Sequence, residues 1–277
     1  MKLSNRYSRR RQIVSLVILG VACWMGAFVP NTSAQGTKAE NDYLEGAILW
    51  QQSSGERRAL SYQSFALARM LLDRDLQHRR LKMRRAIIVD VDDTILDNSP
   101  YEARIVKERE NYPQGWTAWI NRAEAAAVPG ALEFLRYAAS RRVRVFYVTN
   151  RKPIEKEGTA KNLKLLGFPE VTDETLLIAP ASGSSSKEPR PKAISARYHV
   201  VLLMGDDLND FAAVFEDSKT VDARIISTDM NKSQFGTRFI VLPNPMYGNW
   251  ENAIYGYNFK LSEKEKAAIR KSLLRAY

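Results

Sequence analysis

Three short apolar runs stand out along the chain, and each is followed directly by polar residues. They occupy residues 86–89, 143–148 and 200–204 and are rich in branched apolar side chains. Short continuous runs of this kind are typical of parallel strands that are buried on both faces. The polar clusters that follow them begin at Asp90, Thr149 and Gly205.

Apolar residues also recur at helical spacing in several segments between and beside these runs. The predicted helices cover residues 42–52, 59–76, 130–141, 155–166 and 262–276. The last of them begins with a capping box formed by Ser262 and Glu265. Alternating strands and helices predict an α/β fold in which helices flank a parallel sheet on both faces. Ligands of such sheets bind beyond the carboxyl ends of the strands, so we expect the three polar clusters to meet at one site.

Residues 98–128 interrupt this alternation and predict a small cap over the expected site. The segment contains four large aromatic residues, Tyr101, Tyr112, Trp116 and Trp119. Aromatic side chains serve equally well to pack a cap and to contact a substrate, so the pattern leaves both roles open. A helical segment over about 42–82 precedes the first strand.

The first 34 residues have the layout of a secretory signal peptide. Five basic residues and no acidic ones precede an apolar run over 13–29, and the small residues Thr32, Ser33 and Ala34 follow it. We therefore expect export to the periplasm or cell envelope, and one globular domain over 35–277. An uncleaved membrane anchor is the alternative, because the run is only slightly shorter than the about 20 residues that cross a bilayer.

The single cysteine, Cys23, lies inside this apolar run. Cleavage after Ala34 would leave a mature chain without a disulfide bond. Cys23 as a lipidated N-terminus is a second alternative, although Gly20 stands where a lipoprotein signal usually has leucine. Membrane association is thus expected only through an anchor in this segment.

The formal net charge of +11 does not by itself indicate a nucleic-acid-binding protein. Five of the positive charges belong to the signal segment, and no basic cluster is interleaved with aromatic residues. The excess of basic residues nevertheless favours small anionic substrates over neutral ones.

The polar clusters carry the residues that phosphoryl transfer needs. Asp90 and Asp92 follow the first run two residues apart, so an extended chain places both on one side. One carboxylate can attack phosphorus while the other moves the proton of the leaving oxygen. Asp206 and Asp210 can add oxygen ligands for a divalent cation such as Mg²⁺, and Thr149 and Lys187 can bind the phosphoryl oxygens.

Four elements in this order resemble the motifs of the haloacid-dehalogenase (HAD) superfamily: strand-DxDxT, strand-Thr, loop-Lys and strand-GDxxxD. IVDVDDTILDNSPY from Ile88 and VVLLMGDDLNDF from Val200 resemble the paired signature of the class C acid phosphatases, which include lipoprotein 5′-nucleotidases. Further similar segments begin at Ile48, Val145, Ser185 and Leu242, so the resemblance covers nearly all of residues 35–277.

This resemblance implies a Rossmann-like core with a small helical cap and broad activity on phosphomonoesters, including nucleoside monophosphates. It implies one Mg²⁺ held by Asp90, the backbone carbonyl of Asp92 and Asp206, with Asp210 supporting these ligands. It also implies an aspartyl-phosphate intermediate at Asp90. The residues expected to bind the rest of the substrate are Asn150, Trp116 and Tyr247.

Two residues depart from the pattern of the class C enzymes. Asp93 stands where glutamate is common and Asp207 where asparagine or threonine is common. Acids there would bind the cation more tightly and repel an anionic substrate. Neither change removes a catalytic group.

Two other activities and one non-catalytic function are alternatives to phosphate-ester hydrolysis. Asp92 argues against a dehalogenase, because a departing halide needs no proton. Phosphotransfer to an alcohol uses the same residues and stays open. A non-catalytic binding protein on a degenerate phosphatase fold would have damaged motifs, and none is damaged here.

Overall fold

The structure is a computed structural model that describes residues 41–78, 81–182 and 186–277. The predicted signal peptide and Cys23 lie outside these residues. None of the helices within the described ranges is long and apolar enough to cross a membrane.

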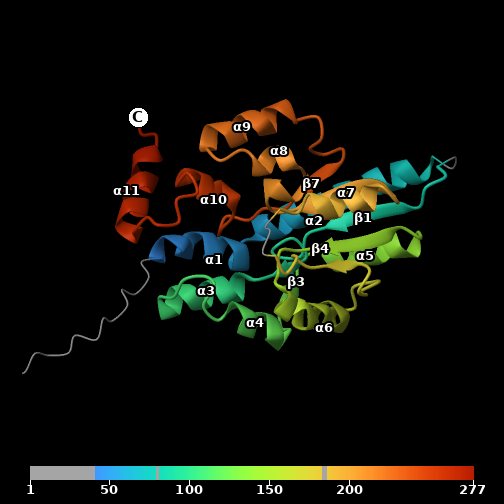
Figure 1. The fold of residues 1–277 in the computed structure, drawn as a ribbon, viewed down its shortest axis with the longest axis horizontal. Helices are drawn as coiled ribbons and strands as arrows, with labels where there is room; N and C mark the ends of the chain where they lie inside the picture. Colours follow the sequence, from blue (N-terminus) through green and yellow to red (C-terminus); the bar gives the residue numbers. More distant parts are fainter. Residues whose placement is uncertain (1–40, 79–80, 183–185) are drawn as a thin grey trace, which may run out of the picture. The chain divides into compact units, whose positions relative to one another are not determined.

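The centre of the described domain is a five-stranded sheet in which every pair of neighbouring strands is parallel (Figure 1). Its spatial order is β5-β4-β1-β6-β7. The strands are β1 (Arg85–Val89), β4 (Arg144–Val148), β5 (Leu176–Leu177), β6 (His199–Gly205) and β7 (Phe239–Val241). The three predicted strands are therefore the three central ones, and their polar ends meet at one edge, as expected.

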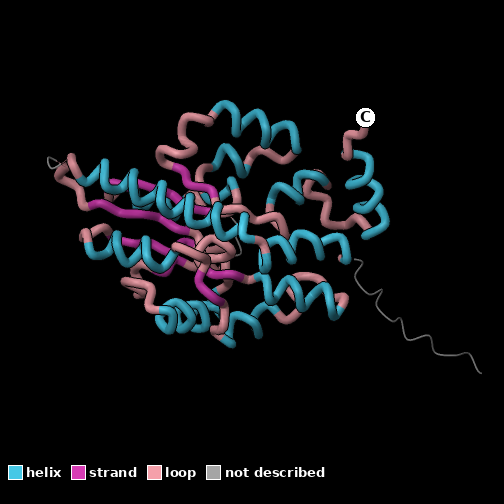
Figure 2. The backbone as a smooth tube through the Cα atoms, turned by 180° about the vertical axis from the view of Figure 1, so that it is seen from behind, coloured by secondary structure: helices cyan, strands magenta, loops and turns pink. Residues whose placement is uncertain are grey.

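Alternate side chains of β1 build two separate layers of the core. Ile87 and Val89 pack in one apolar cluster with residues of α2, α5 and α6, whereas Ala86 and Ile88 pack in another with residues of α7 and α8. The sheet therefore has helices on both faces, as the two opposite views show (Figures 1 and 2). The helices of these layers are α2 (Gly55–Leu76), α5 (Ala131–Ser140), α6 (Lys156–Leu166), α7 (Pro189–Ser195) and α8 (Ala213–Glu216).

Beyond the polar ends of the strands lies a helical cap. The insertion contributes α3 (Ser99–Glu108), α4 (Trp116–Arg122) and β3 (Ala126–Ala127), which pairs antiparallel with β2 (Leu96–Asp97). Val106 of α3 packs with Leu44, Ile48 and Met246, so the beginning and the end of the domain meet on the insertion. The remaining helices here are α1 (Glu45–Ser53), α10 (Asn249–Ile254) and α11 (Glu263–Leu273); α9 (Val221–Met230) follows α8.

The predicted helices all form, with small differences at their ends. The second begins at Gly55 rather than at residue 59, because Ser54 caps it by accepting a hydrogen bond from Arg57 N at 3.1 Å. The last has the expected capping box at Ser262 but ends at Leu273 rather than near Ala276.

Candidate active site

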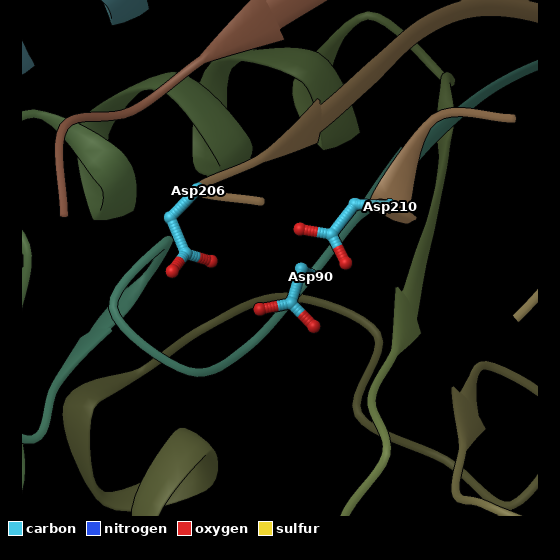
Figure 3. A group of neighbouring side chains, drawn as sticks. All are labelled: Asp90, Asp206 and Asp210. Atoms are coloured by element: carbon cyan, nitrogen blue, oxygen red, sulfur yellow. The ribbon is translucent and has the colours of Figure 1, made fainter. Parts of the chain in front are cut away.

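Three aspartates come together where β1 and β6 end. Asp90 directly follows β1, and its backbone N–H donates to Met204 O at 2.9 Å, which aligns the ends of the two strands. Asp206 directly follows β6, and Asp210 ends the short helical turn after it. One carboxylate oxygen from each lies within 4.8 Å of the others (Figure 3).

Asp206 is oriented by two neutral donors. Thr94 Oγ1 lies 3.0 Å from Asp206 Oδ1, and Asn244 Nδ2 lies 2.8 Å from Asp206 Oδ2. Gly205 allows Asp210 to approach, because a Cβ at this position would lie 2.3 Å from Asp210 Oδ2. The carboxylate groups of Asp206 and Asp210 therefore lie close together beyond the end of β6 (Figure 3).

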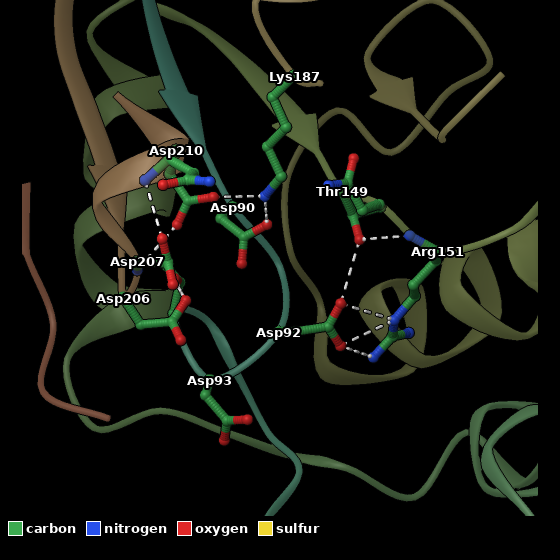
Figure 4. Close-up of polar contacts among 12 residues, drawn as sticks. Asp90, Asp92, Asp93, Thr149, Arg151, Lys187, Asp206, Asp207 and Asp210 are labelled. Carbon is green, nitrogen blue, oxygen red and sulfur yellow. Dashed lines mark hydrogen bonds and ion pairs between the residues drawn. The ribbon is translucent and has the colours of Figure 1, made fainter. Parts of the chain in front are cut away.

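Lys187 brings a positive charge to this group from the loop before α7 (Figure 4). Its Nζ donates to Asp210 Oδ1 at 2.7 Å and also contacts the carboxylate of Asp90. Its backbone N–H donates to Glu216 Oε1 at 3.0 Å, which ties the loop to α8. Lys187 therefore lies beside the aspartates, at the site where its ammonium group was predicted to bind phosphate.

Burial makes the three carboxyl groups hard to ionise together. Burial raises the pKa of Asp90 to about 7, against the lowering effect of the Lys187 ammonium. The pKa of Asp206 is also raised well above its ordinary value, by burial and then by the charges of Asp210 and Asp90, and that of Asp210 is raised chiefly by burial. An all-oxygen set of acids like this suits a hard divalent cation, which would neutralise them.

Asp92 belongs to a different part of the site. Its side chain points away from Asp206 and Asp210, toward Thr149 and Arg151 (Figure 4). Thr149 Oγ1 donates to Asp92 Oδ2 at 3.1 Å, and Arg151 Nη2 donates to Asp92 Oδ1 at 2.8 Å. Although burial alone would raise the pKa of Asp92, the Arg151 guanidinium lowers it overall.

Arg190 holds the chain after β4 in place. Its Nη1 donates to Thr149 O at 2.6 Å, and its Nη2 donates to Asn150 Oδ1 at 2.6 Å. Thr149 is fully buried, whereas Asn150 is exposed next to it. The structure thus brings Thr149 to Asp92 and leaves Asn150 at the rim of the site.

The two aromatic candidates differ in their surroundings. Trp116 is only 8% exposed, and its ring packs edge-on against Tyr101 at 4.9 Å and Tyr112 at 5.9 Å between centroids. Tyr112 is the more exposed ring of this group, at 62%. Tyr247 donates a hydrogen bond to Asp93 and, with Tyr112, lines a cavity of about 500 Å³ between the cap and the C-terminal segment.

The two unusual acids are both bonded to other groups of the protein. Asp93 accepts hydrogen bonds from Tyr247 and, at 3.0 Å, from the backbone N–H of Asn98. Asp207 pairs with Arg224 at 3.3 Å and accepts from Asn209 N at 2.9 Å. They lie beside the aspartate group and connect its loops to the rest of the domain.

Several residues of the site were not predicted as functional. Arg151, Arg190 and Asn244 each contact a candidate residue, and none had been given a role. Arg151 belongs to the polar cluster after β4, so its position in the sequence could have indicated that it lies at the site. Asn244 follows the three-residue strand β7, which the apolar pattern does not reveal.

The model of the HAD superfamily, subfamily IIIB (acid phosphatase), matches residues 26–250. The chain therefore belongs to the subfamily IIIB acid phosphatases of the HAD superfamily. This result confirms the acid phosphatase activity and the HAD-like α/β fold that the motifs suggested.

Two solved structures of a class C acid phosphatase from Bacillus anthracis are similar to it, one of them with tungstate bound. The tungstate-bound structure is 41% identical with a TM-score of 0.82, and the match covers 86% of this chain and 98% of that one. The other gives the same identity and coverage with a TM-score of 0.81. A curated relative, a stem 31 kDa glycoprotein from Glycine max, is 23% identical over 79% of this chain and 75% of its own length.

Proposed function

We propose that this acid phosphatase is an exported, magnesium-dependent phosphomonoesterase in which Asp90 is the nucleophile. The observation that carries the proposal is the position of Asp90, which directly follows a central strand and lies within 4.8 Å of Asp206 and Asp210, next to Lys187. A carboxylate oxygen there can attack phosphorus while the group around it binds the phosphate.

Hydrolysis would proceed in two steps. In the first, an oxygen of Asp90 bonds to phosphorus, the bond from phosphorus to the ester oxygen breaks, and Asp92 gives that oxygen a proton. In the second, Asp92 takes a proton from water as the water oxygen attacks phosphorus, which frees inorganic phosphate and restores Asp90. Because Arg151 lowers the pKa of Asp92, the carboxylate form that the second step uses is favoured, and the protonated form that the first step uses accumulates only as the pH falls.

Other residues stabilise the charge that develops on the phosphoryl group. Lys187 would pair with one of its oxygens and Thr149 would donate a hydrogen bond to another. Asp90, Asp206 and the backbone carbonyl of Asp92 would hold Mg²⁺, with Asp210 supporting them from the side that Lys187 neutralises. When bound, the cation would supply Lewis-acid neutralisation of the phosphate charge.

Nucleoside 5′-monophosphates are the substrate class that we propose within a broad specificity. Tyr112 and Tyr247 line a cavity of about 500 Å³, Tyr247 also bonds to Asp93, and the two rings suit the aromatic base of a nucleoside. Trp116 would support the ring of Tyr112, against which it packs, and Asn150 would contact the substrate at the rim of the site. The similar Bacillus anthracis enzyme with tungstate bound supports an oxyanion site, because tungstate has the tetrahedral shape of phosphate.

Export is proposed from the sequence of residues 1–34. A basic segment, an apolar run and the small residues before Gln35 suit a cleaved signal peptide, with Cys23 lipidation as the alternative. Mass spectrometry of the mature protein decides between them, because cleavage after Ala34 removes Cys23.

A chromogenic aryl phosphate assay tests the proposed function. We expect hydrolysis that is lost in EDTA, is restored by Mg²⁺ and falls by several orders of magnitude in Asp90→Asn, with an unchanged circular dichroism spectrum. A panel of nucleotides, sugar phosphates and aryl phosphates then defines the substrate class, and added alcohol reveals any phosphotransfer. Undiminished turnover of Asp90→Asn would overturn the proposal.

A further inference from the structure

Arg151 holds Asp92 through the edge of its guanidinium group. Arg151 Nη2 lies 2.8 Å from Asp92 Oδ1, and Arg151 Nε lies 3.0 Å from Oδ1 and 3.3 Å from Oδ2. An arginine fork fixes both the position and the plane of a carboxylate, which the single ammonium group of lysine does not do.

The guanidinium also contacts two other residues. Its Nη1 donates to Thr159 Oγ1 of α6 at 3.0 Å, and that hydroxyl donates in turn to Glu155 O at 2.7 Å. The ring of Trp116 from the cap lies 5.7 Å from the guanidinium carbon. The Arg151 side chain is 1% exposed, so little space is left for it to change its conformation.

The two oxygens of Asp92 are not equally occupied. Oδ1 accepts from both Arg151 nitrogens and, at 2.8 Å, from Asn98 Nδ2. Oδ2 accepts from Thr149 Oγ1 at 3.1 Å and has only the longer 3.3 Å contact with Arg151. Oδ2 is therefore the oxygen with room to carry a proton.

We propose that Arg151 is the positioning residue for proton transfer, which fixes Asp92 so that its Oδ2 faces the leaving oxygen and then the attacking water. The proposal rests on the proposed function, in which Asp92 moves these protons. It also gives Trp116 a role, since the cap contacts the acid/base residue through Arg151.

The test compares how much each variant lowers kcat/KM for a substrate with a poor leaving group and for one with a good leaving group. An alkoxide departs poorly without a proton, whereas p-nitrophenolate departs readily. We expect Arg151→Met and Arg151→Lys to lower kcat/KM for glycerol 2-phosphate at least about tenfold more than for p-nitrophenyl phosphate, within the about 10²–10⁴-fold that acid–base catalysis contributes. Thr159→Val removes the hydrogen bond at Nη1 and the one to Glu155 O, leaves the contacts between Arg151 and Asp92 in place, and should have a smaller effect in the same direction.

Two comparisons separate positioning from loss of structure. Arg144→Met is the matched control, because Arg144 lies at the opposite end of β4 and pairs with Glu170 at 3.1 Å and Glu174 at 3.0 Å. It should leave the ratio of the two substrates unchanged. In a protein that already carries Asp92→Asn, Arg151→Met should lower kcat/KM only slightly further, because both changes remove the same proton transfer.

Equal losses on both substrates, or fully additive losses in the double variant, would overturn the role of Arg151. Thermal unfolding identifies a variant that does not fold, and Arg151→Lys and Thr159→Val then carry the test. Failure of the proposed function gives a different result, namely an Asp90→Asn protein that still hydrolyses p-nitrophenyl phosphate.

Discussion

Lys187 Nζ lies 2.7 Å from Asp210 Oδ1 and contacts the carboxylate of Asp90 on its other side. One buried ammonium group therefore pairs with both the proposed nucleophile and the neighbouring acid, and it offsets one of their two negative charges. Asp206, by contrast, has the neutral donors Thr94 and Asn244. The negative charge that Lys187 leaves uncompensated in this group, that of Asp206 included, is the charge that a divalent cation would balance.

Replacement of this ammonium group should damage both catalysis and stability. We expect Lys187→Met to lower kcat by about 10²–10³-fold, the usual cost of one donor to the transition-state charge. Unfolding in EDTA should occur at a lower temperature, because two buried acids lose their counter-charge. Differential scanning calorimetry with and without Mg²⁺ measures the second effect. The control is Lys156→Met, since Lys156 is half-exposed and pairs with exposed Asp173; equal behaviour of the two variants would contradict this interpretation.

Asn244 should influence metal binding without touching the chemistry. Its amide orients Asp206 at 2.8 Å, and the loss of such a partner typically costs about 10–100-fold in metal affinity. We expect Asn244→Ala to need correspondingly more Mg²⁺ for half-maximal activity while kcat at saturating Mg²⁺ stays close to that of the wild type. Asn231→Ala serves as the control, because the Asn231 amide donates to Ser227 O at 2.8 Å at the end of α9, away from the aspartates. An unchanged Mg²⁺ requirement would show that Asp206 does not depend on this hydrogen bond.

Glu102 should make the protein less stable as the pH rises. Burial, followed by the charges of Asp93 and Glu251, raises the pKa of this carboxyl group to about 8, from an ordinary 4.5. Between these values the folded protein keeps a proton that the unfolded chain has lost, so the free energy of unfolding falls with increasing pH. Glu102→Gln mimics the protonated form. Its unfolding temperature should match that of the wild type near pH 4.5 and exceed it above pH 8; a constant difference across this range would contradict the assignment.

The central strands and the polar residues at their ends could be predicted because burial on both faces leaves a plain apolar run. Such a run ends abruptly at Asp90, Thr149 or Asp206, and parallel order brings these ends together. The edge strands β5 and β7 have two and three residues, too few to form a pattern. The apolar pattern therefore could not assign the loop that carries Asn244 to the site, and only the family resemblance placed Tyr247 of that loop there.

The partners of the site residues were harder to predict, because they depend on tertiary contacts. Asp93 accepts a hydrogen bond from Tyr247, which lies 154 residues further along the chain. No pattern near Asp93 in the sequence indicates this partner, so the sequence alone suggested only that the acid would bind the cation. Helical spacing also does not say which ring of the cap faces outward. Trp116 packs inside the cap, and Tyr112 is the ring exposed beside it.

The most direct test of the account is rapid-quench mass spectrometry of the protein mixed with excess p-nitrophenyl phosphate and Mg²⁺, with peptide mapping of the quenched sample. The account predicts a transient acyl phosphate on the peptide that contains Asp90. It should be absent from Asp90→Asn and should persist longer in Asp92→Asn, which lacks the base for the second step. Product formation at the full rate with no phosphorylated Asp90 at any time would contradict the account.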